Sequence, residues 1–311
     1  MQFGFPMQPM PLPLKMPSTQ ILDHTGIEYA TELTAPQKER RRALVVPREH
    51  GAWGVLLIPL MTGVAVGLRP GGRVTPVLLL TTLVLALFWL KTPLESWLGT
   101  GAVEVQTIDE SQLVRRFAIP LITIAAFVGI ALFWRGENRS LLFLGIIAGT
   151  AFAGHLLLKR MGRATRVAAE VVGALALTST APAAYCAATG RLDATAWTLW
   201  LLSWLFAANQ IHFVWLAIRG ARSAGSTEKF QAGVTFLAGQ VLLGAILLVA
   251  SRLAWLPGLT AAAFLPVLLR GFAWFGKSSQ PIRIRRLGWT ELAHAVAFAV
   301  LLAASFSLAQ V

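Results

Sequence analysis

Ionisable and amide side chains lie within or beside long apolar stretches of this sequence. An unpaired ionisable group is costly in such surroundings, so a functional role is the first hypothesis for each of them. The residues predicted to act as acids or bases, or to orient them, are Glu49, His50, His212, Glu291 and His294. The residues predicted to bind a ligand are Lys91, Glu95, His155, Lys159, Glu170, Asn209 and Arg219.

Spacing groups several of these residues on shared helix faces. Residues three, four or seven positions apart in a helix lie on one side of it. This rule places Asn209, His212 and Arg219 together, Glu291 with His294, and His155 with Lys159.

Structural roles are the alternative for the same side chains. Lys91, Lys159 and Arg219 could extend to lipid headgroups, as long basic side chains near helix ends do. Glu170 could pair with Arg166 four residues before it, and Asn209 or a single histidine could link two helices by a hydrogen bond.

The composition excludes an ordinary soluble protein. Of 311 residues, 56% are hydrophobic and 13% are charged, where about a quarter is usual for a soluble chain. The net charge of +13 could indicate nucleic-acid binding, but the cations occur in short clusters between apolar stretches, which is typical of a polytopic membrane protein. No nucleic-acid partner is therefore expected, and the single cysteine, Cys186, excludes an intramolecular disulfide.

The apolar stretches predict an all-α membrane protein with about nine transmembrane helices. A proline-rich N-terminal segment, residues 1–43, is interpreted as a disordered cytoplasmic tail, and residues 44–311 as the nine-helix domain. Each stretch is long enough to cross a bilayer once, and the one at 253–275 is the least regular because Pro257, Pro266 and Arg270 interrupt it. The predicted spans are 52–68, 74–90, 117–134, 140–158, 167–189, 196–218, 233–250, 253–275 and 288–309.

Lysine and arginine counts orient these spans. With the N-terminus in the cytoplasm, the inner segments hold 21 of these residues and the outer segments hold six. Basic residues favour the cytoplasmic side, so we expect a multi-pass membrane protein with its N-terminus in the cytoplasm and its C-terminus outside. All the candidate residues then fall in the cytoplasmic half of the membrane, which predicts a polar pocket open to the cytoplasm.

Four motifs resemble a known family. These motifs are similar to the YwiC-like family of bacterial membrane proteins, which implies that the protein lies in a bacterial inner membrane: VPREHGAWG at 46–54, KTPLESWL at 91–98, ANQIHFVWLAIRGAR at 208–222 and RLGWTELAHA at 286–295. A more distant resemblance is to the UbiA-like intramembrane prenyltransferases, carried by the nine spans and by IHFVWLAIR at 211–219. That resemblance implies a UbiA-like helical bundle with a lipophilic substrate. The aspartate-rich motifs that hold magnesium diphosphate in those enzymes are missing, so no metal site is expected.

Three functions are compatible with these features. The first is binding or modification of a lipophilic ligand with an anionic head group, an isoprenoid for example, with membrane lipids as the other partner. The second is a small-solute or proton-coupled transporter whose histidines and carboxylates relay protons. The third is a haem-binding protein in which two of the four histidines at this depth ligate the iron, for example His50 with His212 or His294; the fourth of these histidines is His155. The sequence identifies no cofactor, and it leaves open whether the protein is an enzyme.

Overall fold

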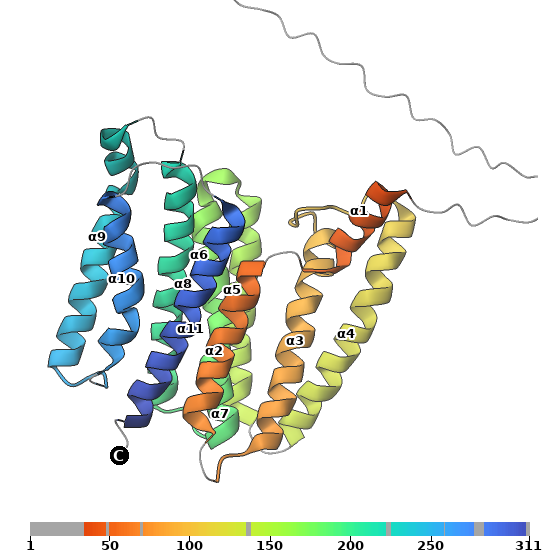
Figure 1. Ribbon diagram of the computed structural model, residues 1–311. Coiled ribbons are helices and arrows are strands. Elements are labelled where there is room, and N and C mark those ends of the chain that lie inside the picture. The colour runs from red at the N-terminus through yellow and green to blue at the C-terminus, as the bar shows by residue number, and fades with distance from the viewer. Residues whose placement is uncertain are drawn as a thin grey trace, which may run out of the picture. The chain divides into compact units, whose positions relative to one another are not determined.

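A computed structural model describes residues 34–47, 50–68, 71–134, 138–221, 225–257, 259–276 and 283–308, and within these ranges the regular structure is helical throughout (Figure 1). The predicted all-α class is therefore confirmed. The helices are α1 (Ala35–Val45), α2 (His50–Gly67), α3 (Val74–Trp97), α4 (Ile108–Trp134), α5 (Asn138–Arg160), the 3-10 helix η1 (Arg163–Thr165), α6 (Arg166–Thr178), α7 (Thr180–Thr189), α8 (Ala194–Gly220), α9 (Ser226–Arg252), α10 (Thr260–Gly276) and α11 (Ile284–Leu308).

Helix α1 begins within the segment interpreted as a tail. The chain divides into two units, Met1–Glu39 and Arg40–Val311, and the second unit contains the transmembrane helices. Within that second unit, Leu44 and Val45 are buried against Val114 of α4. Arg40 donates a 2.6 Å hydrogen bond to Glu110 at the start of α4. Helical structure thus starts before residue 43, where the predicted tail ends, and residues 1–33 lie outside the described part of the chain.

The number of membrane-spanning helices is close to the predicted nine. In the described ranges, seven helices are long and apolar enough to cross a bilayer, with α6 and α7 counted together as Arg166–Thr189. Two shorter apolar helices, Gly51–Gly67 and Thr260–Gly276, account for the other two predicted spans. At about 1.5 Å per residue a 17-residue helix is about 26 Å long, slightly less than a hydrocarbon core of about 30 Å.

The fifth predicted span is broken into α6 and α7 at Ser179. Pro182 explains the break, since proline has no N–H to donate to the carbonyl four residues earlier and its ring collides with that carbonyl. Local hydrogen bonds satisfy part of the interrupted backbone, with Ser179 donating to Ala176 and Thr180 donating to Leu177 and to Leu56 of α2.

Helix α7 lies at the centre of one half of the bundle. Residues 180–188 are all buried, and α7 contacts α2, α3, α5 and α8. The other half packs α8, α9, α10 and α11 around the aromatic residues Phe206, Phe264 and Phe298. Helices α3 and α4 lie side by side (Figure 1), and α4 exposes large apolar side chains such as Phe127 and Trp134. Such exposed apolar helices are consistent with contact with membrane lipids.

Candidate functional site

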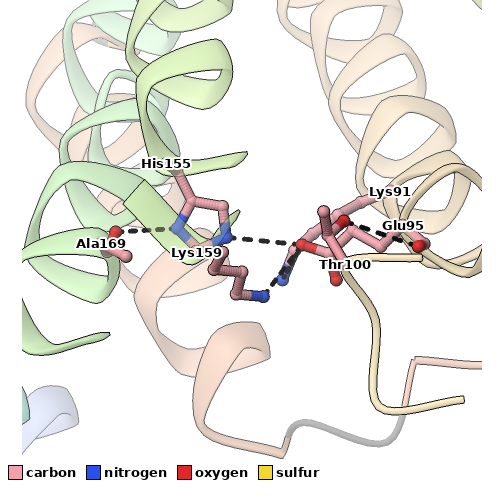
Figure 2. A network of polar contacts seen from close by, with 6 residues as sticks. All are labelled: Lys91, Glu95, Thr100, His155, Lys159 and Ala169. Atoms are coloured by element: carbon pink, nitrogen blue, oxygen red, sulfur yellow. Dashed lines mark hydrogen bonds and ion pairs between the residues drawn. The ribbon is translucent and has the colours of Figure 1, made fainter. Parts of the chain in front are cut away.

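Glu95 is the centre of the first group of polar residues, which Figure 2 shows. Its carboxylate is buried, and Oε1 faces three basic groups at once. Lys159 Nζ donates to it at 3.1 Å, His155 Nε2 lies 3.4 Å away, and Lys91 Nζ forms an ion pair at 3.9 Å. Four of the residues predicted to bind a ligand are therefore brought together.

Two helices supply these four side chains in matching pairs. Lys91 and Glu95 are one turn apart near the C-terminal end of α3, and His155 and Lys159 are one turn apart near the C-terminal end of α5. Spacing of four places each pair on one face of its helix, as predicted, and the two faces meet through the carboxylate. The side chains cross from one helix to the other in Figure 2.

The imidazole of His155 is held from a third helix. Its Nδ1 lies 2.7 Å from the carbonyl oxygen of Ala169 in α6, so Nδ1 carries a proton and donates it. Its Nε2 faces Oε1 of Glu95 at 3.4 Å. Gly173 leaves the space for this ring, because a Cβ at that position would lie 2.7 Å from Nδ1.

The end of α3 is tied to its surroundings, which keeps Glu95 in place. The backbone carbonyl of Glu95 accepts hydrogen bonds of 3.0 Å from the N–H groups of Thr100 and Gly101 in the following loop. Ser96 donates to the carbonyl of Leu44 at 3.3 Å. These hydrogen bonds fix the backbone of α3 that positions the side chain of Glu95.

A second group of polar residues joins α8, α10 and α11. Arg270 of α10 forms an ion pair with Glu291 of α11, and Gln210 of α8 donates a 2.9 Å hydrogen bond to the backbone carbonyl of Glu291. The guanidinium carbon of Arg270 lies 3.8 Å from the ring centroid of Phe213. Both ionic side chains are largely buried, each being 12% exposed.

Arg270 was missed as a site residue by reasoning from the sequence. In the sequence it interrupts the apolar stretch at 253–275 and counts among the basic residues predicted on the cytoplasmic side. The signal was its position inside an apolar helix, where a cation requires a carboxylate partner, and Glu291 was an available carboxylate in the next span.

The remaining predicted residues lie in varied places. His294 Nδ1 contacts the carbonyl of Thr290 in its own helix at 2.6 Å, and His212 is partly buried edge-on against Phe236. Asn209 Oδ1 is buried without a hydrogen-bond partner among the described atoms, and Arg219 is exposed near the end of α8.

Helix α6 carries Glu170, which is partly buried. Arg166, its predicted ion-pair partner, lies with its guanidinium 5.8 Å from the ring centroid of Trp215. At the start of α2, Glu49 and the side chain of His50 lie outside the described part of the chain. The catalytic roles of Glu49, His50, His212, Glu291 and His294 stay predictions.

Both polar groups lie toward the same end of the bundle. Glu95, His155 and Arg270 are near the C-terminal ends of their helices, whereas Ala169 and Glu291 are near the N-terminal ends of theirs. Figure 1 shows the C-terminus at the lower end of α11, so the N-terminal part of α11 is its upper part. The sequence predicts that the candidate residues share one depth in the membrane. The described contacts form two groups, one around Glu95 and one around Arg270 and Glu291.

The chemistry available at these groups is ionic binding and proton exchange. The first group offers two ammonium groups and a histidine around one carboxylate, and the second offers a buried guanidinium and a carboxylate. Within the described ranges, no group of three or more histidine, cysteine, aspartate or glutamate side chains could hold a metal ion.

Comparisons with known proteins identify one relationship. Neither curated proteins nor solved structures gave a match to this chain. Residues 46–185, which include the whole Glu95 group, match the family model described as YwiC-like protein, and over this part of the chain the resemblance predicted from the motifs is confirmed.

Proposed function

We propose that the protein binds a lipophilic molecule with an anionic head group, and that Lys91 and Lys159 hold the head group. The observation that carries the proposal is the convergence of two ammonium groups on one carboxylate oxygen of Glu95. The positive charge of these two ammonium groups, gathered at one place on α3 and α5, can hold a phosphate or carboxylate without a metal ion.

Burial makes this charge effective. The side chains of Lys91 and Lys159 are 16% and 17% exposed, and that of Glu95 is 7% exposed. At an effective dielectric constant of about 20, two unit charges about 4 Å apart interact by about 4 kcal/mol, compared with about 1 kcal/mol in water. An anion that reaches the two lysines would therefore be bound more strongly than at an ordinary surface.

Exposed apolar side chains near the C-terminal ends of α3 and α5 are available to the tail of such a molecule. Leu157 and Met161, on either side of Lys159 in the sequence, are 62% and 70% exposed, and Trp97 at the end of α3 is 65% exposed. An isoprenoid or acyl chain could lie against these side chains while its head group reaches the lysines. Arg219, which is exposed on α8, supplies a further cation at the same end of the bundle.

Binding of two matched lipids tests the proposal. The full chain in phosphatidylcholine nanodiscs is titrated with farnesyl phosphate and with farnesol, which differ only in the charged head group. We expect at least tenfold tighter binding of farnesyl phosphate. In the double variant Lys91→Gln/Lys159→Gln, the affinity for farnesyl phosphate should fall at least tenfold while that for farnesol stays unchanged.

Arg139→Gln is the matched control, because Arg139 is an exposed cation at the opposite end of α5. This variant should bind both lipids as the wild type does. Equal binding of farnesyl phosphate and farnesol by the wild type would contradict the proposal, and so would unchanged farnesyl phosphate binding in the double lysine variant.

A further inference from the structure

One edge of the Arg270 guanidinium is buried and unused. Its Nη1 contacts Glu291, but Nε and Nη2 have no hydrogen-bond partner among the described atoms, and each is almost inaccessible to solvent. The N–H groups of Nε and Nη2 point in parallel directions, which is the arrangement that binds both oxygens of a carboxylate at once. Buried N–H donors are normally hydrogen-bonded, so Nε and Nη2 of Arg270 call for an acceptor.

Glu291 presents the complementary feature. Its Oε2 contacts Arg270, whereas Oε1 is buried and has no hydrogen-bond partner among the described atoms. A carboxylate oxygen only accepts, so Oε1 calls for a donor. The ion pair therefore offers two N–H donors, on Nε and Nη2 of Arg270, and one acceptor, Oε1 of Glu291.

A buried amide lies close to Gly271 of α10. Gln240 of α9 is 1% exposed, and both its Oε1 and its Nε2 lack partners in the described part of the chain. Its Cδ would be 3.0 Å from a Cβ placed on Gly271, the residue that follows Arg270. Four helices, α8 to α11, thus contribute to one neighbourhood, and the aromatic rings of Phe213 and Phe236 form its apolar side.

Charge selects the class of ligand. Arg270 and Glu291 neutralise each other, so a ligand with a net charge would leave an uncompensated charge in a buried place, which is unfavourable. We propose that the pair of Arg270 and Glu291 binds a small zwitterionic solute of the α-amino acid type. Its carboxylate contacts the Nε and Nη2 edge of Arg270, and its ammonium group donates to Glu291 Oε1. This site is separate from the lysine pair proposed for the lipid head group.

Thermal unfolding tests this inference on the full chain in nanodiscs. The protein has 11 tryptophans, so its intrinsic fluorescence reports unfolding. The twenty common L-amino acids are added one at a time at millimolar concentration, and at least one should raise the melting temperature by mass action. For that amino acid, the amine without the carboxylate and the acid without the amino group should each bind at least tenfold more weakly.

Arg270→Lys is the decisive variant, because it keeps the charge beside Glu291 and removes the two parallel donors. It should bind the amino acid at least tenfold more weakly while farnesyl phosphate binding is retained. Arg252→Lys, at the exposed end of α9, should behave as the wild type. The inference is wrong if none of the twenty amino acids raises the melting temperature, if the acid without the amino group binds equally well, or if Arg270→Lys binds as the wild type does.

Discussion

Glu95 balances a dense positive charge, so its removal should affect stability as well as binding. One of its oxygens contacts Lys91, His155 and Lys159. Glu95→Gln preserves the size of the side chain but removes the negative charge that both ammonium groups contact. Removing one partner of a buried ion pair costs about 3 kcal/mol, so we expect a loss of that order in the free energy of unfolding, measured by denaturant titration in mixed micelles.

Glu104→Gln is the control for that measurement, since Glu104 is an exposed carboxylate in the loop after α3. It should change the free energy of unfolding by less than about 0.5 kcal/mol, as surface substitutions usually do. If Glu95→Gln were as mild as Glu104→Gln, the carboxylate would not be the element that holds the two lysines together.

Residue types and spacing predicted part of the site, and only part of its geometry. The pairs Lys91 with Glu95 and His155 with Lys159 follow from helical spacing, which is a local property. That these pairs meet across two helices depends on packing between distant segments, and no single sequence pattern encodes it. The contact between Arg270 and Glu291 also joins two different helices. An arginine within an apolar stretch nevertheless predicts a nearby carboxylate.

At the level of the elements, close packing of α2 against α7 depends on a glycine. A Cβ on Gly63 would lie within van der Waals overlap of the backbone carbonyl of Ala181, and a rigid backbone cannot move aside cheaply. We expect Gly63→Ala to separate the two helices and to lower the free energy of unfolding by about 2 kcal/mol, which is typical of an overpacked core. Denaturant titration of the purified protein measures this change.

Gly54→Ala is the paired control on the same helix. A Cβ there meets nothing within 4 Å, so the change only replaces glycine by a better helix former. It should leave stability unchanged or raise it by up to about 1 kcal/mol. A similar loss in both variants would mean that α2 itself, and not its contact with α7, responds to the substitution.

Helix boundaries show where local rules were sufficient and where they were not. Apolar length located the seven long apolar helices of the described ranges and two shorter ones, because about 20 apolar residues are needed to cross a bilayer. The same criterion merged α6 and α7, since it ignores the proline at 182 that interrupts the backbone hydrogen bonds. It also omitted α1, because its sequence APQKERRRALV is polar, although its residue Arg40 donates a hydrogen bond to Glu110 of α4.

At the scale of the whole molecule, the orientation in the membrane remains a prediction that rests on the distribution of basic residues. Of the 27 lysines and arginines, the predicted inner segments hold 21. The short connections between successive helices make the chain cross from side to side, so the loops before and after each helix lie on opposite sides. Loops 98–107 and 190–193 are therefore expected on opposite sides, the first in the cytoplasm and the second outside.

Labelling of single cysteines tests this orientation. Cys186 is 1% exposed and is replaced by alanine to give a background without thiols. Gln106→Cys and Arg191→Cys then place one exposed thiol in each loop, because both native residues are exposed. In intact cells, a membrane-impermeant maleimide should label the thiol at 191 at once and the thiol at 106 only after permeabilisation. The reverse pattern would place the lysines around Glu95 on the outer side, and a head group supplied from the cytoplasm could then no longer reach them.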